Sequence, residues 1–218
     1  MKIIDGRLVK HIDLLISRYP KLEECRQQIM EAYMILEECF DSEGKLLIAG
    51  NGGSAADAEH IAGELMKSFK LPRPVPLEFA NRMQDIDAER GKILAKNLER
   101  GLPAIPLVAH EALSTAYLND VDGFGVFAQQ LYGFGRSGDV FLAISTSGNS
   151  KNVLNAAIVA KALEMKVIGL TGNDGGELVK VADAVIKVPE METYQIQELH
   201  LPVYHCLCLM LEERFFGA

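Results

Sequence analysis

Two loops rich in glycine and hydroxyl side chains each follow a short apolar run and precede a helix-like stretch, which limits the possible folds. The first loop is residues 50–54, after the apolar run at 45–49. The second loop is residues 145–150, after the run at 140–144. A loop that leaves a parallel strand and opens a helix directs backbone N–H groups and the positive end of the helix dipole at one spot. The loops therefore predict a site for a small phosphorylated molecule, held without a lysine.

Helix-period and strand-like segments alternate along the chain. We expect helices at residues 6–18, 20–41, 54–69, 111–118, 123–133, 150–164, 176–181 and 196–216, and strands at 45–49, 104–109, 139–144, 166–171 and 184–188. Short apolar strands that alternate with helices are typical of a parallel sheet covered on both faces. The pattern predicts an α/β fold with a doubly wound, five-stranded parallel sheet, whose ligand sits beyond the carboxyl ends of the strands.

The chain is long enough to bury a full core as one domain, residues 1–218. We expect an N-terminal helical hairpin at residues 1–42 and a helical insert at residues 75–101. Residues 83–98 of the insert have the pattern of one amphipathic helix. Its apolar positions available for burial are Ile86, Ile93, Leu94 and Leu98. This helix either lies over the ligand site or at a subunit contact, or is a surface helix without a functional role.

Composition excludes several classes of partner. A formal net charge of −8 argues against nonspecific nucleic-acid binding, which depends on Lys and Arg. The longest apolar stretches are strand-sized, and residues 1–5 lack the apolar core of a signal peptide, so we expect a soluble, cytoplasmic protein with no membrane partner. The four cysteines lack metal-finger spacing and are interpreted as buried thiols.

Candidate proton-transfer residues lie on two of the predicted helices. His60 and Glu64 are four residues apart on the helix that leaves the first loop, so they share one face. Near the other end of the chain stand Gln197, Glu198, His200 and His205. A carboxylate with an imidazole suits proton transfer or a divalent metal. The alternatives are a solvated His–Glu pair and, at the second loop, a Ser150 that merely caps the next helix. Because His200 and His205 differ by about 140° on a helix, one of them is expected to be structural.

The motifs resemble those of the phosphoheptose isomerases, which are sedoheptulose 7-phosphate isomerases of the sugar isomerase (SIS) domain superfamily. The resemblance rests on both loops, on Asp57-Ala58, His60, Glu64-Leu65 and Asn119-Asp120, and on residues 138–140, 170–176 and 196–198. It implies a flavodoxin-like sheet, a homotetramer with active sites between subunits, and one zinc ion per subunit.

The resemblance also implies a role for individual residues. Glu64 would be the base and His205 the acid in the conversion of sedoheptulose 7-phosphate to D-glycero-D-manno-heptose 7-phosphate through an enediol, a step of heptose biosynthesis. The zinc ligands would be His60, Glu64, Gln197 and His205. The substrate would be bound by Asn51, Gly52, Gly53, Ser54, Asn119, Asp120, Ser145, Thr146, Ser147, Ser150 and Gln197.

Two alternatives to this activity remain. One is an isomerase of another phosphosugar, because the loops recognise phosphate and not the carbon chain. The other is a non-catalytic relative that binds a replication initiator protein, which the presence of both Glu64 and His205 disfavours.

Pro202, between Gln197 and His205, is the least regular feature of the candidate site. It predicts either a kinked helix or a helix that begins near Leu201, with Gln197 in the lead-in. A break there, or ligands from different subunits, would help Gln197 and His205 to converge.

Overall fold

Five parallel strands form the centre of the molecule, in the order β2-β1-β3-β4-β5. The computed structural model describes residues 5–217. Residues 1–4 and residue 218 lie outside the described residues. The first four belong to the stretch expected to lack the apolar core of a signal peptide. The strands are β1 (Leu46–Ala49), β2 (Ala104–Pro106), β3 (Val140–Ile144), β4 (Lys166–Thr171) and β5 (Ala184–Lys187). The doubly wound parallel sheet predicted from the sequence is confirmed, although β2 is three residues shorter than expected because residues 107–109 form a 3₁₀ turn.

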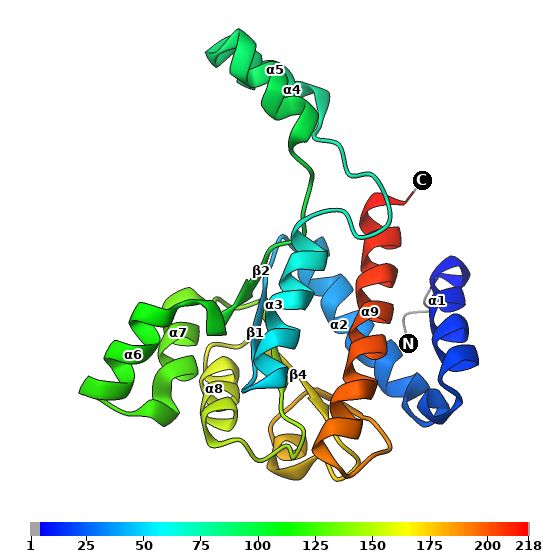
Figure 1. Ribbon diagram of the computed structural model, residues 1–218, viewed down its shortest axis with the longest axis vertical. Helices are drawn as coiled ribbons and strands as arrows, with labels where there is room; N and C mark the ends of the chain where they lie inside the picture. The colour runs from blue at the N-terminus through cyan, green and yellow to red at the C-terminus, as the bar shows by residue number, and fades with distance from the viewer. Residues whose placement is uncertain (1–4, 218) are drawn as a thin grey trace.

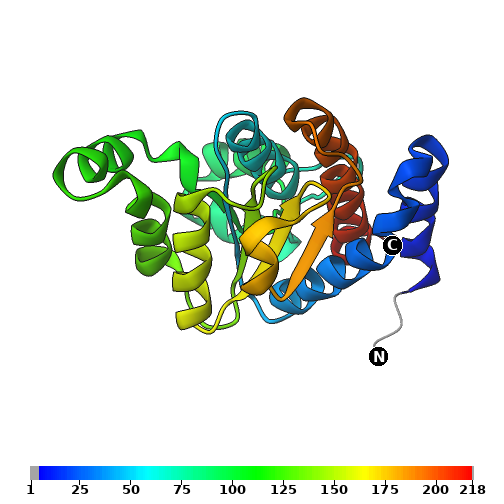
Figure 2. The same cartoon turned by 90° about the horizontal axis from the view of Figure 1, so that it is seen from below.

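Helices cover both faces of this sheet, and alternate strand residues supply the two cores (Figure 2). Leu46 and Ile48 of β1 face α2 (Arg26–Asp41), α3 (Gly53–Met66) and α9 (Thr193–Phe216). Leu47 and Ala49 face α7 (Val126–Phe134) and α8 (Lys151–Ala162). Since side chains alternate across a strand, apolar residues at every position require cover on both sides, which explains the three-layer arrangement.

The N-terminal hairpin expected at residues 1–42 is present in the described part of the chain. It consists of α1 (Gly6–Arg18), a 3₁₀ helix, η1 (Pro20–Cys25), and α2. The second predicted helix is therefore divided: η1, with Pro20 at its first position, precedes α2. Further short elements are α6 (Glu111–Asp120), η2 (Leu107–Ala109), η3 (Gly123–Gly125) and η4 (Gly176–Lys180).

The last helix, α9, runs without a break from Thr193 through Pro202 to Phe216. The alternative that the helix begins near Leu201 is therefore wrong, and Gln197 lies inside the helix. Pro202 removes one backbone donor, but its ring is buried among the core side chains of α9, whose packing holds the helix together. No helix within residues 5–217 is long and apolar enough to cross a membrane.

The insert forms two helices and not the single helix expected over residues 83–98. These are α4 (Leu77–Ile86) and α5 (Ala88–Asn97), which pack on each other and project from the body as an arm (Figure 1). The break falls at Asp87, whose side chain accepts a hydrogen bond from the backbone of Arg90 and so starts α5. The residues expected to be buried are exposed in the single chain: Ile86, Ile93, Leu94 and Leu98.

Candidate active site

Helix α3 carries the first part of the candidate site. It begins at the first loop, where Gly52 has φ +57°, a backbone conformation that favours glycine. His60 and Glu64 lie on one face of α3, and His60 Nε2 is 3.2 Å from Glu64 Oε1. The second carboxylate oxygen of Glu64 is buried and has no hydrogen-bond partner in residues 5–217, although Lys67 Nζ approaches it to 3.6 Å. Glu64 thus presents an oxygen with free lone pairs.

Helix α9 brings His205 to the same place. The Nε2 atoms of His205 and His60 are 3.5 Å apart, and the two ring centroids are 5.0 Å apart. The predicted convergence of His60, Glu64 and His205 is therefore seen within one chain. Burial lowers the pKa of His205, an effect that nearby His60 reinforces and Glu64 opposes. His205 is consequently held as the neutral ring near pH 7.

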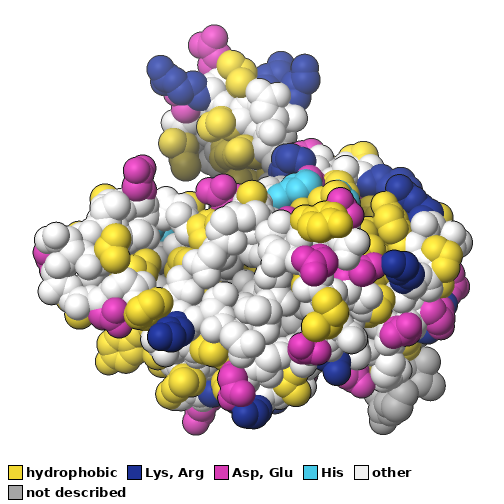
Figure 3. Space-filling model, turned by 60° about the horizontal axis from the view of Figure 1, so that its bottom comes forward, with side chains coloured by type: hydrophobic (Ala, Val, Ile, Leu, Met, Phe, Trp, Pro, Cys, Tyr) yellow, Lys and Arg dark blue, Asp and Glu magenta, His cyan; other side chains and the backbone are white. Residues whose placement is uncertain are grey.

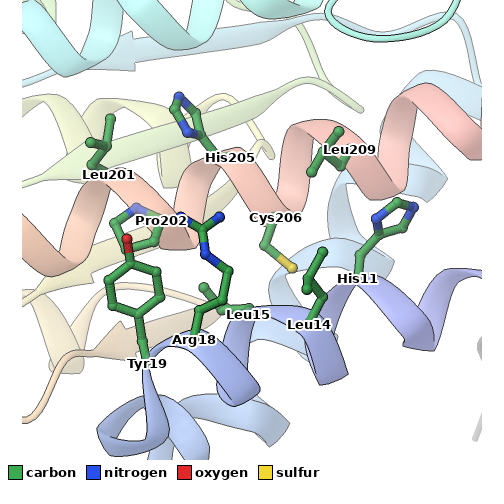
Figure 4. A pocket seen from close by; sticks show the side chains of 10 residues that line it. All are labelled: His11, Leu14, Leu15, Arg18, Tyr19, Leu201, Pro202, His205, Cys206 and Leu209. Atoms are coloured by element: carbon green, nitrogen blue, oxygen red, sulfur yellow. The ribbon is translucent and has the colours of Figure 1, made fainter.

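His205 also lines a hollow of about 170 Å³ between α1 and α9 (Figure 4). The lining is apolar along Leu14, Leu15 and Leu201, with the Arg18 side chain at one side. On the molecular surface, histidine side chains are visible on the part of the body nearest the arm (Figure 3). His200, by contrast, is fully buried, so it is the structural member of the pair.

Two further residues contact the site and were given no role from the sequence. The buried Tyr204 hydroxyl is 3.0 Å from His60 Nδ1 and donates to Asp57 Oδ1 at 3.2 Å. Burial raises the pKa of Asp57, and the hydrogen bond from Tyr204 opposes this shift. Asp57 was noted in the sequence only as part of the first motif, and its position three residues before His60 on α3 is the signal that indicates a shared face.

The second loop is linked to the first across the carboxyl ends of β1 and β3. Asn51 and Asn152 exchange two amide hydrogen bonds of 2.9 and 2.8 Å. Ser150 occupies the N-cap position of α8, yet its side chain makes no capping bond and instead lies 3.0 Å from Ser145 Oγ. The interpretation of Ser150 as merely a helix cap is therefore not supported by its contacts.

A hollow of about 540 Å³ lies beside these loops. Asn51, Ser150, Lys151 and Asn152 line it, and Phe124 closes one side. The Lys151 ammonium lies 5.2 Å from the centre of the Phe124 ring. A cation thus stands beside the predicted anion site, although the sequence was interpreted as providing no lysine.

The other predicted substrate residues are distributed as follows. Asn119 and Asp120 hydrogen-bond to each other at the exposed end of α6, outside the lining of this hollow. Ser147 accepts a hydrogen bond from the backbone of Asn149, and Thr146 accepts one through its carbonyl from Gly172. Gln197 packs against Gly53, where an added Cβ would lie only 2.6 Å from the Gln197 Nε2 atom. Gly53 is therefore required for this close approach.

The loops and the proton-transfer residues lie at opposite ends of the sheet within one chain. The carbonyl of Leu65, next to Glu64, accepts a hydrogen bond from Leu102, which precedes β2. Glu64 is thus beside the amino ends of the strands, whereas both loops follow the carboxyl ends. The ten residues from Ser54 to Glu64 span about 15 Å along α3. One chain does not bring all the predicted site residues together.

The donor set partly fits a zinc ion. Imidazole nitrogens and a carboxylate oxygen are zinc ligands, and His60, Glu64 and His205 supply them at close range. Gln197 lies away at the first loop, two turns of α9 before His205. Within residues 5–217, no three His, Cys, Asp or Glu side chains already take the arrangement of a metal centre, so His60, Glu64 and His205 would have to rearrange to hold an ion.

Known proteins similar to this chain point to one family. The family model for the SIS domain matches residues 13–106 and 84–172. A phosphoheptose isomerase of Sulfurimonas denitrificans is 35% identical over 216 residues, which cover 99% of this chain and 97% of the relative. A phosphoheptose isomerase of Helicobacter pylori is 39% identical over 194 residues, 89% of this chain and 88% of the relative.

Solved structures give the same result. A phosphoheptose isomerase from Francisella tularensis superposes with a TM-score of 0.74 at 30% identity, covering 95% of this chain and 97% of the other. The phosphoheptose isomerase from Neisseria gonorrhoeae gives 0.69 at 32% identity, with 93% and 96% covered. The chain therefore belongs to the phosphoheptose isomerases, the sugar-phosphate isomerases built on the SIS domain.

Proposed function

We propose that the chain converts sedoheptulose 7-phosphate to D-glycero-D-manno-heptose 7-phosphate in heptose biosynthesis. The observation that carries the proposal is the convergence of His60, Glu64 and His205 in a chain of this family. Movement of the carbonyl from C2 to C1 requires loss of a proton from C1, a cis-enediol, and return of a proton at C2. Each step needs one group that accepts a proton from carbon and one that exchanges protons with the sugar oxygens.

Glu64 is the group suited to the carbon. Its Oε2 atom is buried without a hydrogen-bond donor in the described part of the chain, so its lone pairs are available. As the base, Glu64 takes the proton from C1 and returns it to C2. Lys67 Nζ lies 3.6 Å from this oxygen and places a positive charge beside it.

His205 is the group suited to the oxygens. Since burial keeps its ring neutral, His205 donates a proton through its N–H to the oxygen that becomes negative. The imidazolate left by this donation then takes a proton from the neighbouring hydroxyl as the enediol collapses, which returns the ring to its neutral form. His60 Nε2 contacts both groups, Glu64 Oε1 at 3.2 Å and His205 Nε2 at 3.5 Å.

The complete site needs a second copy of the chain. The eight bonds from C1 to phosphorus in an extended heptose 7-phosphate span about 10 Å at roughly 1.2 Å per bond. This is shorter than the distance of about 15 Å between Ser54 and Glu64 along α3. We therefore propose a homotetramer in which the loops of one subunit hold the phosphate and the Glu64–His205 group of a neighbour acts on C1 and C2.

One zinc ion per subunit is part of the proposal. His60, Glu64 and His205 would hold it, and Gln197 would reach it from a neighbouring subunit. Because Glu64 and His205 are also the proposed base and acid, such an ion would either supply positive charge beside the oxygens of the developing enediolate or occupy the site only at rest.

Solvent hydrogen exchange tests this function. The protein is incubated with sedoheptulose 7-phosphate in deuterated water, and deuterium at C1 or C2 is measured by mass spectrometry. We expect exchange with the wild-type protein and none with Glu64→Gln, which keeps the size but loses the base, whereas Glu59→Gln, an exposed residue of the same helix, retains it. Exchange with another ketose phosphate but not with this one would assign a different substrate. A wild-type protein inert toward every sugar phosphate would indicate a non-catalytic relative.

A further inference from the structure

Two amide side chains join the first loop to the start of α8. Asn51 Nδ2 donates to Asn152 Oδ1 at 2.9 Å, and Asn152 Nδ2 donates to Asn51 Oδ1 at 2.8 Å, so the two amides form a ring of two hydrogen bonds. The residues meet beyond the carboxyl ends of β1 and β3, which are neighbours in the sheet. Because β2 lies on one side of this strand pair and β4 on the other, the ring stands at the crevice where a doubly wound sheet binds its ligand.

A backbone N–H fixes the direction of the two bonds. Turning both amides over would exchange donors and acceptors and leave the same ring. The N–H of Val153 distinguishes the two arrangements, since it donates to Asn152 Oδ1 at 3.0 Å. A backbone N–H can only donate, so a reversed Asn152 amide would bring two donors together and leave the Val153 N–H without a partner. Val153 therefore orients the Asn152 amide, and Asn152 orients the Asn51 amide.

This orientation leaves one hydrogen of the Asn51 amide free. An amide NH₂ carries two hydrogens, and Asn152 takes one of them. Within residues 5–217, the Asn51 amide bonds to no group other than Asn152. Asn51 Nδ2 and the Val153 N–H bond to the same oxygen, so the Asn51 amide stands beside the first turn of α8. The N–H groups of that turn have no partners within the helix.

The amide pair also lines the space in which a ligand would lie. Asn51 and Asn152 both line the hollow of about 540 Å³, together with Ser150 and Lys151. They also line an adjoining hollow of about 320 Å³ that extends to Gly52 of the first loop. A phosphate in this space would meet the free hydrogen of Asn51 and the amino end of α8 at once, and hydrogen bonds to an anion are the stronger kind.

We infer that Asn152 is a positioning residue, which turns the Asn51 amide so that its free N–H donates to the phosphate and thereby joins the two loops into one anion site. The identity of the sugar that carries this phosphate rests on the proposed function. The orientation of the two amides and the binding of phosphate do not.

A double-mutant cycle tests whether Asn152 acts through Asn51. Inorganic phosphate is the probe, because it occupies an anion site without being turned over, and its affinity is measured by isothermal titration. We expect Asn51→Ala to weaken binding about 10-fold and Asn152→Ala about 3- to 10-fold, the range for one hydrogen bond lost or poorly oriented. The double variant should bind no more weakly than Asn51→Ala, because without the Asn51 amide Asn152 has nothing to position.

The cycle separates positioning from helix capping. If Asn152 served only to accept from the Val153 N–H, its removal would weaken phosphate binding by the same factor whether or not Asn51 is present. Gln27→Ala is the matched control, since it removes another exposed amide hydrogen bond, that of Gln27 to Glu31 on α2. This variant should bind phosphate as the wild type does.

Kinetics provide a second readout. With sedoheptulose 7-phosphate, Asn152→Ala should raise KM about 3- to 10-fold with little change in kcat, because the lost orientation affects the phosphate and not the reacting carbons. Equal effects of Asn152→Ala in the presence and absence of the Asn51 amide would overturn the inference, as would a phosphate affinity unchanged in Asn152→Ala. Both results come from phosphate binding alone, so a failure of the proposed function would be seen separately, as absent solvent exchange in a protein that still shows the coupling.

Discussion

His200 and His205 lie five residues apart on α9 and meet different surroundings. The His200 side chain is fully buried, whereas His205 reaches the candidate site. Burial lowers the pKa of His200 from 6.5 to about 4, because the charged ring would lose its hydration. His200 is therefore neutral in the folded protein throughout the physiological pH range.

This shift makes stability depend on pH. Between pH 6.5 and about 4 the unfolded chain binds a proton at His200 that the folded chain does not, so the free energy of unfolding falls as the pH decreases. The full effect is about 3 kcal/mol. Urea unfolding at pH 7 and pH 5 should show the loss in the wild type and a much smaller loss in His200→Leu. The same pH dependence in both proteins would contradict this assignment.

At the residue scale, contacts between side chains of the same helix were easier to predict from the sequence than contacts between two helices. His60 and Glu64 were found because a spacing of four residues places side chains on one face. The contact of Tyr204 with His60 depends on how α9 packs against α3, and no spacing in the sequence reports that. Asp57 had a usable signal, its place three residues before His60, but its importance became clear only with Tyr204 beside it.

At the scale of elements, the second loop and the start of α8 act as one unit. Ser145 and Ser150 hydroxyls contact each other and not the free N–H groups of α8. The Val153 N–H is already bonded to Asn152 Oδ1, and the buried Ser145 hydroxyl accepts from the Ser150 N–H. A phosphate at the amino end of the helix would therefore be met by the N–H groups of Lys151 and Asn152 and by the Ser150 hydroxyl.

Ser150→Ala tests this role. The substitution should weaken binding of the sugar phosphate by roughly 1 to 3 kcal/mol, the range for a lost hydrogen bond to a charged group. Isothermal titration with phosphorylated and unphosphorylated sugar provides the comparison, since binding of the neutral sugar should hardly change. Equal losses for both ligands would show that the loop has only a structural function.

The end of α3 is tied to α9 by a buried ion pair. The Arg73 guanidinium bonds Glu212 at 2.9 to 3.0 Å and donates to the carbonyls of Glu64 and Leu65. These carbonyls belong to the last turn of α3 and have no partner within the helix. Arg73 therefore holds the segment that leads from α3 to α4, and it also holds the backbone at Glu64.

Arg73→Met should be strongly destabilising. It leaves the Glu212 carboxylate buried without its charged partner, which typically costs about 3 to 5 kcal/mol. Arg82→Met breaks the exposed pair with Glu78 and should cost about 0 to 1 kcal/mol. Urea unfolding of both variants at one protein concentration measures the difference. Similar losses would mean that the buried pair has no special role.

The sequence placed most elements within a few residues, and the exceptions have physical causes. The insert was predicted as one helix because the helical spacing of its apolar residues continues past Asp87. The role of Asp87 as the N-cap of α5 is seen only in the structure, where the backbone becomes extended at this residue. A start of α9 near Leu201 was one of the two expectations for Pro202, since a proline inside a helix costs a hydrogen bond. Packing of α9 on the sheet overrides that local cost.

At the scale of the whole molecule, the single chain leaves apolar surface uncovered. The arm buries Ala80 and Gly91, while Leu77 is 82% and Ile86 87% exposed. Two short helices with so little buried surface are not stable alone in water. Together with the separation of the loops from Glu64, this surface supports the proposed assembly, and it favours a subunit contact over a free surface helix for the insert.

Assembly can be measured directly. Light scattering should give a mass near four times 23.9 kDa for the wild type. Replacing Leu77 and Ile86 together by Asp should shift the mass toward smaller species and lower the activity, because burying the two carboxylates at a subunit contact is costly while their exposure in the single chain is not. Ile158→Asp changes an exposed apolar residue of α8 and should leave the mass unchanged. A tetramer unaffected by the arm substitutions would show that the arm lies outside the subunit contacts, and a wild-type monomer would remove the proposed shared site.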